Sequence, residues 1–191
     1  MPYDFTSKIA VITGGSRGIG LAVAMQLSSY GARVCINYNS SKERAEKAVE
    51  EIIQAGGDAI AVQADVSDPE QAKRLIKQAE DQLGPVDFLV NNAGVFDVAA
   101  HDAFGEQMWH HMMKINVDGV FYCTWAVKDG MVARKYGRIV NIASIAGLEA
   151  KPYAIAYATS KAAVVGFTRS LGQALAAMNV RVNAVAPGLI D

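Results

Sequence analysis

The chain has 191 residues, of which 51% are hydrophobic and 19% are charged, and its formal net charge at pH 7 is -1. This length and composition are typical of one compact globular domain and exclude a disordered chain or a disulfide scaffold. The balanced charge argues against a nucleic-acid partner, and the lack of a long apolar segment or signal-peptide pattern predicts a cytoplasmic protein without membrane association.

Short apolar runs rich in β-branched residues alternate along the whole chain with segments of helical periodicity. Two features mark the helix limits: Ser67 or Asp68 can cap the helix that Pro69 begins, and a glycine stands where each of three helices should stop. These glycines are Gly31, Gly56 and Gly84. The predicted strands are residues 8–13, 33–37, 59–63, 86–90, 137–142 and 180–185. The predicted helices are residues 19–30, 42–55, 69–83, 105–133 and 153–177.

Strands this apolar are typical of a parallel sheet that helices cover on both faces. Two successive sets of alternating strands and helices predict an α/β fold, a Rossmann-type doubly wound parallel sheet. No linker or low-complexity tract divides the chain, so we expect a single domain over residues 1–191. The last predicted strand, 180–185, is as apolar as a central strand and would be unprotected at the edge of the sheet.

A glycine-rich turn, TGGSRGIG, joins the first predicted strand to the first predicted helix. The backbone N–H groups and the dipole at the start of a helix can receive a pyrophosphate, and glycines let the backbone approach it closely. The turn could be merely a tight connection, but its place in a βαβ unit favours dinucleotide binding. The residues predicted to bind the cofactor here are Gly14, Ser16, Arg17, Gly18, Ile19 and Gly20.

The end of the second strand predicts which dinucleotide binds. An acid at this point would hydrogen-bond the ribose 2′-hydroxyl of NAD, but the sequence has Asn37, Tyr38 and Asn39. The absence of an acid, together with the cationic Arg17, favours the 2′-phosphate of NADP(H) over NAD(H). We therefore predict that Asn37 and Tyr38 contact NADP(H). The alternative for Arg17 is that it is simply a solvated residue of the turn.

Tyr157 and Lys161 lie four residues apart in a predicted helix, so both side chains project from one face. An ammonium group beside a phenol stabilises the phenolate, which makes the phenol a usable proton donor and acceptor near neutral pH. Any helix offers many pairs at this spacing, and such a pair taken alone is more often an ordinary surface contact than a catalytic couple.

No metal site is predicted. Cys35 and Cys123 lack the spacing of metal ligands and lie in apolar segments, which is typical of buried free thiols. His101, His110 and His111 are not arranged as ligands on one helical face, so we expect them at the surface or at the rim of a pocket.

Four motifs in order resemble the short-chain dehydrogenase/reductase family over residues 8–188: TGGSRGIG, NNAG at 91–94, Ser144 after the fifth strand, and YATSK at 157–161. The resemblance implies a catalytic tetrad, in which Tyr157 protonates the carbonyl oxygen and Ser144 polarises it. Lys161 would assist the tyrosine and hold the nicotinamide ribose, while Asn116 would keep a water molecule near the lysine. The further cofactor contacts that the resemblance implies are Asp65, Val66, Asn92, Ala93, Gly94, Pro187 and Gly188.

The chain is most similar to the branch of bacterial 3-oxoacyl-acyl-carrier-protein reductases, which implies NADP(H)-dependent reduction of a small-molecule or acyl-thioester carbonyl. Another small ketone, a sugar or a steroid stays open as substrate, and so does an inactive dinucleotide-binding fragment. The family usually continues past this chain's last residue, so we expect a fragment that lacks the substrate lid and the last strand and turns over poorly. The helices at 105–133 and 153–177 carry surplus apolar residues and are predicted to form a homodimer or homotetramer.

Overall fold

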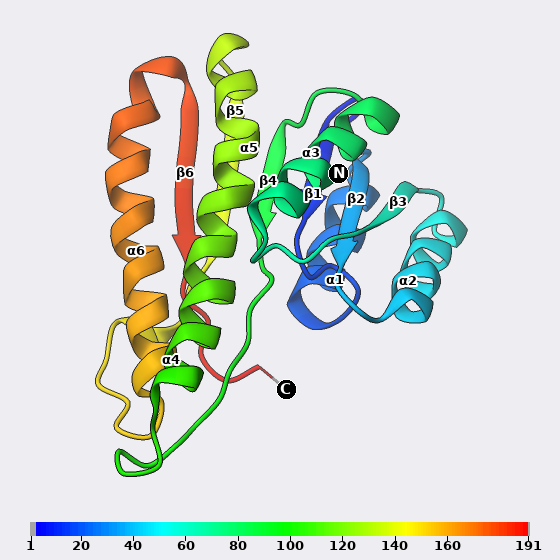
Figure 1. Cartoon of the computed structure of the whole chain (residues 1–191). Coiled ribbons are helices and arrows are strands. Elements are labelled where there is room, and N and C mark those ends of the chain that lie inside the picture. The colour runs from blue at the N-terminus through cyan, green and yellow to red at the C-terminus, as the bar shows by residue number, and fades with distance from the viewer. Residues whose placement is uncertain (1–2, 191) are drawn as a thin grey trace.

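The computed structural model describes residues 3–190 and contains one sheet of parallel strands in the order β3-β2-β1-β4-β5-β6 (Figure 1). The strands are β1 (Ile9–Ile12), β2 (Arg33–Tyr38), β3 (Asp58–Gln63), β4 (Phe88–Asn91), β5 (Gly137–Ile142) and β6 (Val180–Val185). The α-helices are α1 (Gly18–Ser29), α2 (Lys42–Gln54), α3 (Pro69–Leu83), α4 (Glu106–Met113), α5 (Gly119–Ala133) and α6 (Ile155–Leu175). Met1, Pro2 and Asp191, the ends of the predicted domain, lie outside the described residues.

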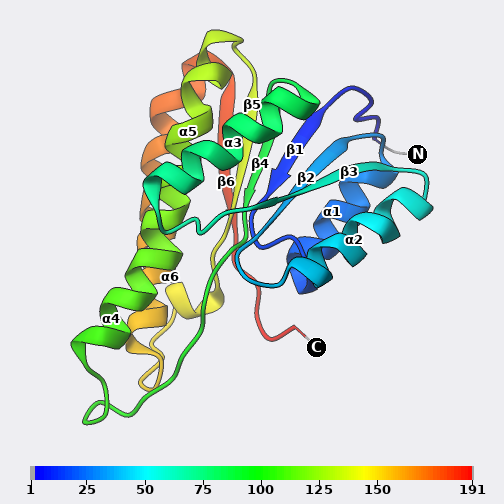
Figure 2. The same ribbon diagram turned by 45° about the vertical axis from the view of Figure 1, so that its right-hand side comes forward.

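Helices pack on both faces of the sheet (Figure 2). Successive strand residues point to opposite faces, so Val11 of β1 belongs to the core beneath α3, α5 and α6, whereas Ile12 belongs to the core beneath α1 and α2. All four residues of β1 are buried, as expected of a central strand covered on both sides. The predicted Rossmann-type, doubly wound sheet is confirmed.

Local chemistry explains where the helices begin and end. The Asp68 carboxylate accepts a hydrogen bond from the backbone N–H of Gln71 over 2.9 Å, so Asp68 rather than Ser67 caps α3. Three glycines after helices have the positive φ that favours glycine, as their positions predicted. They are Gly31 (93°), Gly56 (88°) and Gly84 (109°).

Two predicted helices differ in detail from the structure. The helix predicted at 105–133 is continuous but contains a π-helical turn at Lys114–Asp118 between α4 and α5. The helix predicted at 153–177 starts later, because the Tyr153 carbonyl accepts a hydrogen bond from the backbone N–H of Ala99 (2.9 Å) before α6 begins.

The strand order places a crevice at one end of the sheet. β1 lies between β2 and β4, so the connections after β1 and β4 leave in opposite directions at the carboxyl ends of the strands. The segments that follow β4, β5 and β6 meet at this same end (Figure 1). Residues that are remote in sequence therefore come together there, and the crevice is the natural place for a ligand.

Both cysteines are buried, and burial raises the pKa of Cys35 and that of Cys123 to about 12. The prediction of buried free thiols is confirmed. Within residues 3–190, no cluster of three or more His, Cys, Asp or Glu side chains is arranged to hold a metal ion. None of the helices described here combines the length and the apolar character that a membrane span requires.

Candidate active site

The crevice has two adjoining parts. The larger part, about 440 Å³, runs from the glycine turn to the ends of β2 and β3. The smaller part, about 200 Å³, lies between the ends of β4, β5 and β6 and the start of α6. The two parts share four lining residues, so they form one continuous cleft. These residues are Ile19, Asn92, Gly94 and Val95.

Glycine is required at several points of the turn between β1 and α1. Gly14 and Gly18 have φ values of 61° and 52°, which side chains rarely tolerate. A Cβ atom on Gly20 would lie 2.5 Å from the carbonyl oxygen of Gly14 and 2.5 Å from Nδ2 of Asn92. The turn therefore presents bare backbone at the start of α1, where N–H groups and the helix dipole favour a phosphate.

Thr13 and Asn92 lock the turn after β1 to the segment after β4. The Thr13 hydroxyl oxygen accepts hydrogen bonds from the backbone N–H groups of Asn92 and Ala93, and each bond is 3.0 Å long. The Asn92 side chain donates from Nδ2 to the carbonyl oxygens of Thr13 (2.9 Å) and Gly14 (3.0 Å). These bonds hold both walls of the cleft in one arrangement. Thr13 was not among the predicted site residues.

The far end of the larger part is cationic and polar. Arg17 and Arg44 both line it and are exposed, and neither forms an ion pair within residues 3–190. Arg44 lies in the first turn of α2 and was missed, because a charged residue on an exposed helix face usually indicates only solvation. The other polar residues that line this end are Asn37, Tyr38, Asn39, Ser40, Ser41 and Asp65.

Two of the predicted cofactor contacts are already bonded within the protein. The buried Asn37 side chain accepts from the N–H of Gly14 (3.3 Å) and donates to three carbonyl oxygens, the shortest bond going to Ala64 (2.9 Å). The Asp65 carboxylate accepts hydrogen bonds from the N–H and the hydroxyl of Ser67. The Asn37 side chain is therefore not free for a cofactor. It supports the glycine turn after β1, and the residue contributes to the wall of the cleft chiefly with its backbone.

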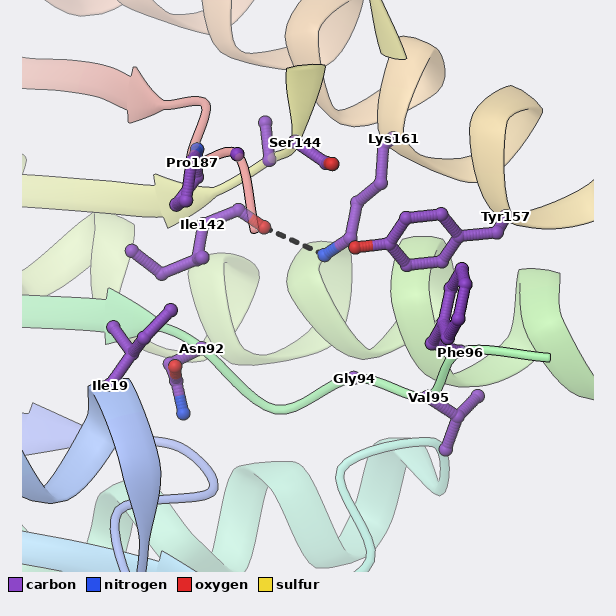
Figure 3. Close-up of a pocket in the computed structure, with 12 residues that line it drawn as sticks. Ile19, Asn92, Gly94, Val95, Phe96, Ile142, Ser144, Tyr157, Lys161 and Pro187 are labelled. Atoms are coloured by element: carbon purple, nitrogen blue, oxygen red, sulfur yellow. Dashed lines mark hydrogen bonds between the residues drawn. The ribbon is translucent and has the colours of Figure 1, made fainter. Parts of the chain in front are cut away.

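Ser144, Tyr157 and Lys161 meet in the smaller part of the cleft (Figure 3). Lys161 is 5% exposed and donates from Nζ to the carbonyl oxygen of Ile142 over 2.7 Å. Burial lowers the pKa of its amine to about 8. Its Nζ lies 5.7 Å from the centre of the Tyr157 ring, so the helical spacing does bring the two side chains together.

Ser144 is the N-cap residue of a short helical turn, Ile145–Gly147, that the sequence did not predict. Its hydroxyl oxygen accepts a hydrogen bond from the N–H of Ala146 over 3.1 Å. This bond leaves the hydroxyl proton available to a ligand oxygen. The serine thus stands in the cleft as a fixed hydrogen-bond donor.

Asn116 lies behind the cleft and is fully buried, in the π-helical turn. Its side-chain oxygen accepts from the N–H of Val95 (2.8 Å), and its Nδ2 donates to the Val95 carbonyl oxygen (2.9 Å) and the Ser160 hydroxyl (3.1 Å). Asn116 therefore ties the segment after β4 to α6. Ser160, its partner on α6, was also missed, since nothing in its spacing indicated a bond to a residue 44 positions away.

Most of the predicted site residues line the cleft, and three do not. Gly20 lies behind the turn, Asn116 lies beneath Val95, and Val66 packs against Gly119 of α5, where an added Cβ would lie 3.0 Å from its side chain. Pro187 and Gly188 line the smaller part, as does Phe96, which the sequence did not indicate.

Comparisons with known proteins show the family of the chain. A family model described as short chain dehydrogenase matches residues 8–191. The 3-oxoacyl-acyl-carrier-protein reductase of Synechocystis sp. is 43% identical over 185 residues, which are 97% of this chain and 75% of that protein. The corresponding reductase of Staphylococcus aureus is 41% identical over 184 residues, 96% of this chain and 75% of that protein. The crystal structure of a variant actinorhodin polyketide ketoreductase with NADPH has a TM-score of 0.94 and 37% identity, covering 96% of this chain and 71% of that one.

Proposed function

The chain belongs to the short-chain dehydrogenase family and is an oxidoreductase, and from this premise we propose that it reduces the ketone of a 3-oxoacyl thioester to a secondary alcohol with NADPH. The observation that carries the proposal is the meeting of Ser144, Tyr157 and Lys161 in a cleft that continues into the glycine turn. The substrate class rests on the two bacterial reductases, which are more than 40% identical to the chain.

The residues present suit a dinucleotide. A Cβ at Gly94 would lie 3.1 Å from Oδ1 of Asn116 and 3.6 Å from Nζ of Lys161, so the glycine leaves space beside the lysine for a ribose and nicotinamide. The start of α1 would receive the pyrophosphate. Arg17 and Arg44, with no acid at the end of β2, favour the 2′-phosphate of NADP(H), and the ketoreductase relative was solved with NADPH. When bound, the nicotinamide supplies the hydride.

The protein's own groups supply the proton and hold the substrate. The Ser144 hydroxyl donates a hydrogen bond to the carbonyl oxygen and stabilises the negative charge that develops there. The Tyr157 hydroxyl donates its proton to the same oxygen as the alcohol forms. Lys161 keeps positive charge beside the phenol, and its bond to Ile142 fixes the amine in place. Asn116 holds Val95 and Ser160, and through them the two walls around the lysine.

Loss of NADPH absorbance with acetoacetyl thioester tests the proposal. Tyr157→Phe should abolish turnover and spare NADPH affinity, because it removes only the transferable proton. Lys161→Ala should impair both, since it removes a charge from the phenol and from the ribose site. Tyr153→Phe is the matched control, because that tyrosine is 68% exposed and does not line the cleft. A Tyr157→Phe protein that keeps most of the rate would exclude Tyr157 as the proton donor.

We also propose that α5 and α6 form the contact of a homodimer or homotetramer. Phe121 and Trp125 of α5 are 37% and 45% exposed, and their rings stack with centroids 4.5 Å apart. Exposed aromatic pairs of this kind are typical of protein interfaces. Light scattering should give a dimer or tetramer for the wild type and a monomer for Trp125→Glu. A cytoplasmic location stays a prediction.

A further inference from the structure

Phe96 is a solvent-exposed aromatic residue in the segment after β4. It is 61% exposed although it lines the smaller part of the cleft beside the catalytic groups. Its ring packs edge to face against the Tyr157 ring, with centroids 4.8 Å apart and an angle of 83° between the planes. Figure 3 shows the ring directly below the phenol. An exposed aromatic ring inside a cleft offers apolar contact area to whatever enters it.

The backbone on both sides of Phe96 is held in place. The N–H and carbonyl groups of Val95 both bond to the buried Asn116, over 2.8 and 2.9 Å. The N–H of Ala99 bonds to the carbonyl of Tyr153, over 2.9 Å. The ring therefore stands on a segment anchored to the π-helical turn and to the residues just before α6. A ligand that contacts it loses little free energy in ordering this wall.

The surroundings of the ring favour an apolar group over a charged one. Among the described residues, Lys161 is the only charged side chain that lines this part of the cleft, and its amine bonds to Ile142. Most of the remaining lining is aliphatic or glycine. An apolar group of a ligand would therefore find apolar contact next to the catalytic hydroxyl groups.

We propose that Phe96 determines specificity, selecting ketones that carry an aryl group next to the reacting carbonyl. The carbonyl oxygen meets Ser144 and Tyr157, and the aryl group packs against the free side of the Phe96 ring. This assignment rests on the proposed carbonyl reduction and narrows its substrates to 3-oxoacyl thioesters with an aryl group on the reacting carbonyl; acetophenone carries that aryl ketone without the thioester.

The test compares acetophenone with cyclohexyl methyl ketone, which has the same size without the aromatic ring, using the full chain and NADPH. Wild type should favour acetophenone. Phe96→Leu, which keeps apolar bulk and removes the ring, should lower kcat/KM for acetophenone by about 10-fold, mainly through KM, and change that for the saturated ketone by less than about 2-fold. Val98→Ala is the control, since Val98 is 57% exposed on the same segment but does not line the cleft.

Equal losses for both ketones in Phe96→Leu, or no preference in the wild type, would overturn the assignment. Binding of 1-phenylethanol and 1-cyclohexylethanol in the presence of NADP⁺, measured by calorimetry, provides a readout without turnover. If wild type reduces no ketone but binds the aryl alcohol better in a Phe96-dependent manner, the proposed function fails and the assignment of Phe96 stands. If wild type reduces ketones, but Phe96→Leu changes neither the preference between the two ketones nor that between the two alcohols, only the assignment of Phe96 fails.

Discussion

Asn141 of β5 donates a hydrogen bond from Nδ2 to the hydroxyl oxygen of Thr168 on α6, over 2.9 Å in the protein interior. Its own side-chain oxygen accepts from Nδ2 of Asn91 (2.8 Å). The next residue, Ile142, accepts the bond from Lys161. Helix α6 is therefore tied to β5 at two points, through Thr168 and through Lys161.

Replacing Thr168 with Val should therefore destabilise the protein. The shape of the side chain is nearly unchanged, but the Asn141 amide loses its buried acceptor, at a cost of about 1–3 kcal/mol in the free energy of unfolding. Thr168→Ser keeps the hydroxyl and is the matched control. Urea unfolding measures both. Equal stability of Thr168→Val and wild type would show that the bond contributes nothing.

The amine of Lys161 should make stability depend on pH in the alkaline range. Burial lowers its pKa from the ordinary 10.5 to about 8, so between these values the unfolded chain binds more protons than the folded one. The free energy of unfolding then rises with pH across this window, and the full penalty of burying the charge is present below pH 8. Without bound nucleotide, wild type should gain on the order of 2 kcal/mol relative to Lys161→Met between pH 7 and pH 10.

Urea unfolding of both proteins at several pH values measures this difference. Other groups titrate in the same range, but they are common to the two proteins and cancel in the difference. The difference between the curves therefore reports the titration of Lys161, including any change in its bond to Ile142 as the amine loses its proton. Parallel curves for the two proteins would mean that the buried amine keeps its ordinary proton affinity.

Arg44 should contribute to the choice of NADPH over NADH. Arg44→Ala and Arg17→Ala should each weaken NADPH binding by about 5- to 10-fold and leave NADH binding nearly unchanged, because each removes one charge near the predicted 2′-phosphate. Fluorescence titration with both nucleotides measures the ratio. Arg169→Ala, which removes an exposed arginine of α6 outside this part of the cleft, is the control. If the two arginine variants weakened NADH binding as much as NADPH binding, recognition of the 2′-phosphate by these arginines would be excluded.

Gly94→Ala should reduce nucleotide affinity without a large loss of stability. The added methyl group would lie 3.1 Å from Oδ1 of Asn116 and 3.6 Å from Nζ of Lys161, in the space proposed for the ribose. Gly94 itself is exposed, so only the side chains of Asn116 and Lys161 have to shift to admit the methyl group. Gly105→Ala, at a glycine with open space around its Cα, is the matched control. Unchanged NADPH affinity in Gly94→Ala would place the ribose elsewhere.

The sequence by itself determined the elements and their order. Apolar runs, helical periodicity, the glycine turn and the caps are written in residues that are adjacent or a few positions apart, and these local patterns agree with the sheet that forms. The spacing of Tyr157 and Lys161 belongs to the same kind of evidence, because four residues along a helix bring two side chains to one face. The doubly wound arrangement also followed, since two successive sets of apolar strands and helices leave few topologies.

The tertiary structure alone decided what surrounds those residues. Phe96 lies against Tyr157, and the Asn116 amide bonds to Val95 and Ser160. No local pattern records these contacts, because they join segments 21 to 61 residues apart and depend on the direction in which each side chain leaves its own backbone. That direction is fixed only when the helices have packed on the sheet and each buried polar group has found its partner.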